Sequence, residues 1–122
     1  MIRQATQKDL KFIKELIDSY PSVLMKQIPN IKSFFVAVED NRVVGCCALD
    51  IYSTRIAEVR SLAVHKDYQR LGIGTALVER CLKKAKDNKI YEVLAITSRE
   101  NLFKELGFNT FHKEKLALLK II

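Results

Sequence analysis

The sequence is poor in glycine and proline, with four Gly and two Pro in 122 residues, which excludes collagen-like and linker-like chains. No apolar run approaches the roughly 20 residues of a membrane span, and the N-terminus lacks the apolar core of a signal peptide. The three cysteines are an odd number, and no His or Cys stands at zinc-ligand spacing from them. We therefore expect reduced cysteines, no metal site, no membrane contact and a cytoplasmic location.

The remaining composition is that of an ordinary folded domain. Its 48% hydrophobic content excludes a disordered chain, and the length predicts one domain over 1–122 that buries roughly two-thirds of its unfolded surface. The net charge is +7, from 21 Lys and Arg against 14 Asp and Glu. This charge suits a nucleic acid, an anionic membrane or a phosphorylated small molecule, and it equally describes a solvated basic surface.

Apolar spacing predicts alternating strands and helices. The expected strands are 2–5, 33–39, 42–51, 56–64, 91–97, 108–112 and 116–122, and the expected helices are 7–20, 98–106 and one that follows residue 75. Thr6 and Asp9 resemble a capping box, and Asp40-Asn41 is a two-residue turn signal. Residues 21–32 are expected to be irregular or a short helix. The order of elements predicts a mixed α/β sheet with an antiparallel part.

Alternation along the expected strand 56–64 divides its side chains between two faces. One face carries Glu58, Arg60, Leu62 and Val64, and the other carries Ala57, Val59, Ser61 and Ala63. A carboxylate within an apolar strand is costly unless it is paired or functional. Glu58 is therefore either the ion-pair partner of Arg60 or a residue with a chemical role.

A glycine-bearing loop, Q-R-L-G-I-G-T at 69–75, directly precedes the strongest amphipathic helix. The first turn of a helix has unpaired N–H groups, and glycines let a phosphate approach the backbone. Gly72 and Gly74 meet that need, and Arg70 adds positive charge. The loop is neither a Walker loop nor a Rossmann fingerprint, because no Gly-Lys-Ser/Thr follows and the third glycine is missing. It is therefore either an anion site or a tight turn that requires small residues.

The residues around this loop carry a family resemblance. Residues 62–77, L-A-V-H-K-D-Y-Q-R-L-G-I-G-T-A-L, resemble the acetyl-CoA signature of the GNAT N-acetyltransferase superfamily. Residues 105–108, E-L-G-F, resemble the end of the family's last helix, and the order of elements is also the family's. The resemblance covers nearly the whole chain. It implies a GNAT-like mixed, mostly antiparallel central sheet flanked by helices, and acetyl-CoA as co-substrate.

The resemblance also implies how the co-substrate binds. The strand end would pair with the pantetheine arm as an added strand, and loop amides would hold the pyrophosphate. The implied co-substrate residues are Leu62, Ala63, Val64, Gln69, Arg70, Leu71, Gly72, Ile73, Gly74 and Thr75. Arg80, Lys83 or Lys84 either contacts the 3′-phosphate or belongs to a solvated helix face. Acetyl-CoA then accounts for the basic charge, and no nucleic acid is expected, since the chain lacks an aromatic stacking platform.

Direct acetyl transfer to an amine needs a base, because an ammonium group is no nucleophile. Glu58 stands where GNAT enzymes with a glutamate base carry that residue, so the resemblance implies this role, with the ion pair to Arg60 as the alternative. A backbone N–H near Leu62 or Val64 would stabilise the oxyanion. Phe103 stands where many family members have the tyrosine that protonates the thiolate. The candidates left for that acid are Tyr68, Tyr91 and water.

One branch of the family resembles the chain most. Residues 35–39, 43–49 and 58–64 are similar to short N-acetylglutamate synthases, which acetylate the α-amine of glutamate. Such an acceptor carries carboxylates that arginine binds bidentately, so Arg60 and Arg99 are candidate acceptor residues, with a solvated surface as the alternative for Arg99. Residues 23–28 differ from the basic stretch usual in this branch, so another amino acid remains possible as the acceptor.

Two other functions stay open. An acetyltransferase of the same fold could act on a protein or peptide, given an open groove for a chain. Alternatively, the missing tyrosine suits a non-catalytic module that binds acetyl-CoA. The apolar segment 116–119 would allow a homodimer.

Overall fold

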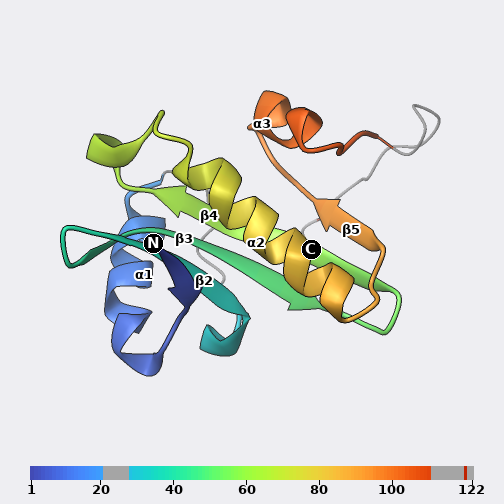
Figure 1. Cartoon of the computed structure of the whole chain (residues 1–122), viewed down its shortest axis with the longest axis horizontal. Helices are drawn as coiled ribbons and strands as arrows, with labels where there is room; N and C mark the ends of the chain where they lie inside the picture. The colour runs from blue at the N-terminus through green and yellow to red at the C-terminus, as the bar shows by residue number, and fades with distance from the viewer. Residues whose placement is uncertain (21–27, 111–119, 121–122) are drawn as a thin grey trace.

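The computed structural model describes residues 1–20, 28–110 and 120 (Figure 1). Within them, one sheet has its strands in sequence order: β1 (Ile2–Gln4), β2 (Phe34–Glu39), β3 (Arg42–Ile51), β4 (Ile56–Val64) and β5 (Glu92–Ala95). Neighbouring strands are antiparallel except β4 and β5, which run parallel. The prediction of a mixed, mostly antiparallel sheet is confirmed.

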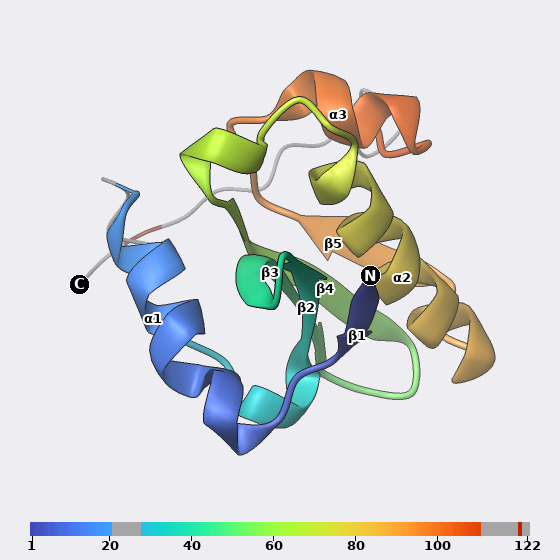
Figure 2. The ribbon, with the colours of Figure 1, turned by 60° about the vertical axis from the view of Figure 1, so that its left-hand side comes forward.

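Helices cover both faces of this sheet. Figure 2 shows α1 (Leu10–Asp18) on one side and α2 (Ile73–Asp87) on the other, with α3 (Glu100–Glu105) beyond one end of the sheet. Short 3₁₀ turns are η1 (Gln7–Asp9), η3 (Ile31–Ser33) and η4 (Lys66–Tyr68). The described residues accordingly form two hydrophobic core clusters, one on each face of the sheet. The α1 side buries Ile13, Leu16 and Ile17, and the α2 side buries Leu77, Val78, Cys81 and Ala85.

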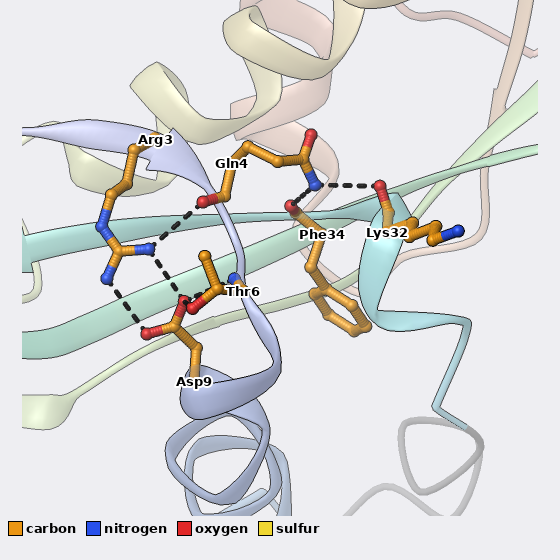
Figure 3. Close-up of polar contacts among 6 residues, drawn as sticks. All are labelled: Arg3, Gln4, Thr6, Asp9, Lys32 and Phe34. Atoms are coloured by element: carbon orange, nitrogen blue, oxygen red, sulfur yellow. Dashed lines mark hydrogen bonds and ion pairs between the residues drawn. The ribbon is translucent and has the colours of Figure 1, made fainter.

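The start of the first helical segment is held by one buried carboxylate (Figure 3). The N–H of Thr6 donates to Asp9 Oδ2 at 2.7 Å, which is the backbone half of the predicted capping box. Arg3 donates to both oxygens of Asp9, at 2.8 and 3.0 Å. Asp9 is only 4% exposed. The hydrogen bonds from Arg3 are the largest cause that holds the pKa of Asp9 below its usual 3.8. These contacts join β1 to α1.

The turn between β2 and β3 is the predicted one. Asp40 and Asn41 have φ values of 51° and 60°. Two successive left-handed residues match the right-handed twist of the flanking strands. The hairpin therefore forms at the position that the Asp-Asn pair predicts.

β4 contains a bulge that the alternation of the sequence does not predict. Arg60 pairs with Ala48 of β3, and Ala63 pairs with Cys46, so residues 61–62 together face a single residue of β3. The extra residue shifts every later side chain of β4 to the opposite face.

The predicted face assignment is consequently wrong beyond the bulge. Ser61 adopts φ 57° there. Leu62 and Val64 pack into the core on the α2 side, whereas Ala63 joins the core on the α1 side. Glu58 therefore does not share a face with Leu62 and Val64.

The end of the described chain differs from the expectation of a strand at 108–112. Residues 108–110 are not in a strand. Gly107 has φ 91°, and the N–H of Phe108 donates to the carbonyl of Phe103 at 3.0 Å. The rings of Phe103 and Phe108 pack edge to face at 5.1 Å, so Phe108 closes α3 instead of starting a strand. Residues 21–27, 111–112, the predicted strand 116–122 except residue 120, and the apolar segment 116–119 lie outside the described residues.

Candidate active site

β4 has an edge that its neighbour β5 leaves uncovered. β5 pairs with β4 only from Ile56 to Val59, so the edge from there to Val64 has no strand partner on that side within the described residues (Figure 1). The N–H of His65 donates to Val44 of β3 at 2.7 Å. Since successive residues of an antiparallel strand alternate between its two edges, the N–H and C=O of Val64 point to the uncovered edge.

Two side chains occupy that edge. The hydroxyl of Tyr20 lies 3.3 Å from both the N and the O of Val64. Gln69 Nε2 donates to the same carbonyl at 3.0 Å. The backbone of Val64 is thus accessible to hydrogen-bonding groups, and an extended ligand added to this edge would take the place of these side chains.

The glycine loop follows directly from this edge. Arg70 and Gly72 both have left-handed backbones, with φ of 64° and 82°, and Gly72 is the residue that precedes α2. A Cβ on Gly72 would meet no heavy atom within 4 Å. The first N–H groups of the 15-residue helix α2 have no carbonyl partner within the helix, so they can bind an anion there. The open space at Gly72 would admit one.

Gly45 of β3, which the sequence analysis did not single out, lets α2 lie close to the sheet. A Cβ on Gly45 would lie 3.1 Å from Leu77 Cδ1 and 3.2 Å from Ile73 Cγ2. These contacts are tighter than normal, so a larger residue would push away the first turns of α2. A lone glycine within a strand was the available signal, since it commonly marks a close approach.

The carboxylates of β3 and β4 form a second polar group. Glu58 lies directly opposite Asp50 in the β3–β4 register. Tyr52 Oη donates a hydrogen bond to Glu58 Oε1. Arg60 Nη1 lies 3.6 Å from Asp50 Oδ2. Arg60 thus forms an ion pair with Asp50. The sequence analysis had named Glu58 as the alternative partner of Arg60.

Tyr52 is a hydrogen-bond donor at this place. Burial raises the pKa of its phenol most, followed by the hydrogen bond to Glu58 and the charges of Glu58 and Asp50, while a hydrogen bond with Arg60 lowers it. The phenol therefore keeps its proton at neutral pH. Sequence reasoning missed Asp50 and Tyr52, because only the strand register places them beside Glu58.

The other predicted residues lie elsewhere. Arg99 is exposed, and its N–H donates to Thr97 Oγ1 at 2.8 Å just before α3. Phe103 is 5% exposed, within the core on the α2 side. Tyr68 Oη donates to Asp40 Oδ2 at 3.0 Å, and Tyr91 is 75% exposed. Tyr68 and Tyr91 therefore stay predictions for the thiolate acid.

The basic side chains of α2 have local partners. Arg80 and Lys84 lie over the Phe35 ring, at 4.5 and 5.5 Å from its centroid. Lys83 pairs with Asp87 at 2.9 Å, one helical turn further on. Both readings of these residues, a 3′-phosphate contact and a solvated helix face, therefore stay predictions.

The cysteines are free and buried, as the reduced state requires. Burial is the main cause that raises the pKa of Cys46 to about 12, so its thiol is not a nucleophile at neutral pH. Among the described residues, no group of three or more His, Cys, Asp or Glu could hold a metal ion. The same part of the chain has no helix with both the length and the apolar character needed to cross a membrane.

Comparison with known proteins settles the family. Residues 3–108 match the Acetyltransferase (GNAT) family. The chain belongs to this family. The predicted fold and the predicted enzyme class, an acetyl-CoA-dependent N-acetyltransferase, are thereby confirmed.

Several relatives resemble the chain over most of its length. An uncharacterized N-acetyltransferase of Chlorobaculum tepidum is 32% identical, over 93% of this chain and 77% of the relative. An amino-acid acetyltransferase of Mycobacterium tuberculosis is 30% identical, over 88% of this chain and 67% of the relative. The crystal structure of N-acetylglutamate synthase from Neisseria gonorrhoeae, complexed with coenzyme A and N-acetyl-glutamate, has a TM-score of 0.78 and 27% identity. That match covers 95% of this chain and 30% of the synthase.

Proposed function

We propose that this GNAT enzyme transfers the acetyl group of acetyl-CoA directly to the α-amine of an amino acid, with glutamate as the first candidate. The observation that carries the proposal is the arrangement along β4. Its uncovered edge at Val64 leads into the glycine loop, and Glu58 of the same strand lies among polar residues. The relatives named amino-acid acetyltransferase and N-acetylglutamate synthase support this choice of acceptor.

The co-substrate would lie along the uncovered edge. The pantetheine arm would pair with the backbone of residues 62–64, after displacing the hydroxyl of Tyr20 from Val64. The pyrophosphate would lie over Gly72 and accept hydrogen bonds from loop and helix amides, where a Cβ would otherwise project into open space. Glycine at position 72 thus suits both the left-handed backbone and the ligand.

The chemistry would use Glu58 as the base. The carboxylate takes a proton from the acceptor ammonium, and the neutral nitrogen then attacks the thioester carbon. A backbone N–H near Leu62 or Val64 stabilises the oxyanion that forms. The nitrogen bonded to the acetyl carbon then loses its second proton to water, and the carbon–sulfur bond breaks. The leaving thiolate takes up a proton from water, Tyr68 or Tyr91. The products are the N-acetylated amine and CoA.

Arg60 would bind a carboxylate of the acceptor. It lies on the same strand and the same face as Glu58, two residues away, so both can contact one amino acid. Asp50, 3.6 Å from the guanidinium, would hold it in place. Arg99 is proposed as a second anion contact on the strength of the family resemblance and its exposure.

The direct test is release of free thiol from acetyl-CoA in the presence of single amino acids, polyamines and peptides. Turnover of glutamate or another amino acid over the other amines would support the proposal. Preference for peptides would instead identify a protein acetyltransferase. CoA binding without thiol release from any amine would identify a binding module.

We also propose that the chain forms a single catalytic domain that works in the cytoplasm. Three free, buried cysteines support a reducing compartment. A homodimer stays a prediction, since the segment 116–119 that suggested it lies outside the described residues. Light scattering of the purified chain would measure its mass in solution.

A further inference from the structure

Two carboxylates face each other at the end of the β3–β4 ladder. Asp50 and Glu58 are direct register partners. Like charges at such paired positions repel across a sheet, so each needs a compensating partner. Arg60 lies 3.6 Å from Asp50, and the hydroxyl of Tyr52 donates to Glu58. Arg60 thus pairs with Asp50, and the phenol of Tyr52 contacts both Glu58 and Arg60.

The loop that carries Tyr52 is held by several hydrogen bonds. The N–H of Tyr52 donates to the carbonyl of Ile56 at 3.1 Å, across the start of β4. Ser53 Oγ accepts from the N–H groups of Arg55 and Ile56, at 3.0 and 3.2 Å. Arg55 in turn binds both carboxylate oxygens of Glu92 in β5, at 2.8 and 3.2 Å. The backbone that carries Tyr52 is therefore held by hydrogen bonds within the loop and by the contact of Arg55 with β5.

We propose that Tyr52 is a positioning residue for the Glu58 carboxylate. This inference rests on the proposed function, in which Glu58 accepts a proton from the acceptor amine. A glutamate side chain has freely rotating bonds, and a small displacement of a catalytic group costs much of its effect. The bond from Tyr52 to Oε1 restricts that rotation and leaves Oε2 to receive the proton.

The charge environment keeps this arrangement intact near neutral pH. Among the described residues, the charged groups that act on the Tyr52 phenol are Glu58, Asp50 and Arg60. Burial and the two carboxylates raise the pKa of the phenol, so Tyr52 donates to Glu58 and does not replace it as a base.

The test is Tyr52→Phe, assayed by thiol release. Tyr52 is 51% exposed, so the variant should fold, and its melting curve with CoA checks that it does. We expect kcat to fall roughly 10- to 100-fold, as for a misplaced catalytic group, while KM for acetyl-CoA changes less than about 2-fold. A fall in kcat with an unchanged KM for acetyl-CoA is a split that a role limited to stability would not produce.

The same substitution in a Glu58→Gln background is the decisive comparison. If Tyr52 acts through Glu58, Tyr52→Phe should change kcat less than about 2-fold there. An equal loss in both backgrounds would overturn the positioning role and leave Glu58 as the base. If Glu58→Gln alone keeps full activity, the proposed base is wrong, and the role of Tyr52 is overturned with it.

Discussion

Replacing Gly72 by alanine separates backbone strain from ligand contact. Gly72 has φ +82°, and a Cβ there would meet no atom within 4 Å. The cost to the free protein is therefore the left-handed backbone alone, about 1–2 kcal/mol. Gly107 has φ +91° and equally open space around its Cβ position. Gly107→Ala is thus a matched control, because it introduces the same backbone strain at a site outside the glycine loop.

The effect on co-substrate binding should be larger. The open space at Gly72 is where the proposed pyrophosphate would lie, so a methyl group there would push the anion away from the amides of α2. Losing one charge-assisted hydrogen bond costs about 1.5–3 kcal/mol, or roughly 10- to 150-fold in Kd. Gly107→Ala should leave Kd unchanged.

Thermal unfolding with and without CoA measures both effects. At a ligand concentration of about 100 times Kd, binding stabilises the wild type by about 2.7 kcal/mol. That free energy raises the Tm of a domain of this size by about 10 °C. A variant with about 100-fold weaker binding keeps only ~0.4 kcal/mol, a shift of 1–2 °C. A full shift in Gly72→Ala, or an equally reduced shift in Gly107→Ala, would refute the placement of the ligand at the loop.

Three further substitutions test the base, the acceptor contact and the helix start. Glu58→Gln should lower turnover roughly 10²- to 10⁴-fold at neutral pH and leave CoA affinity intact, with partial recovery at high pH because more of the amine is then neutral; an equal loss at every pH would contradict the assignment. Arg60→Lys should lower kcat/KM for an acidic amino acid roughly 10- to 150-fold and barely affect an uncharged amine, because lysine cannot bind a carboxylate bidentately. Asp9→Asn should lower the free energy of unfolding by about 1–2 kcal/mol in urea titrations at neutral pH, since the partly exposed Arg3 loses its charged partner. The folded-state pKa of Asp9 lies below 3.8, so this contribution is complete above pH 3.8 and is lost as pH falls through the lower value; a difference between the two proteins that persists in acid would rule the mechanism out.

Features that depend on neighbours in the chain could be predicted from the sequence. The turn at Asp40 and Asn41 and the hydrogen bond from Thr6 to Asp9 involve residues at most three apart. The glycine loop could also be predicted, because the left-handed residue Gly72 and the start of α2 are adjacent in the sequence. The family signature also lies in one continuous stretch, so the enzyme class could be recognised before any coordinates.

The composition of the site depended on contacts between distant segments. The bulge at residues 61–62 arises from the pairing of β4 with β3, and it reversed the faces that alternation had assigned to Leu62 and Val64. The same register brings Asp50 opposite Glu58, and Tyr20 reaches Val64 from 44 residues away. Period-two alternation carries no information on where a strand gains an extra residue or which strand lies beside it. Cross-strand register, which only the folded sheet specifies, therefore decided which groups surround Glu58.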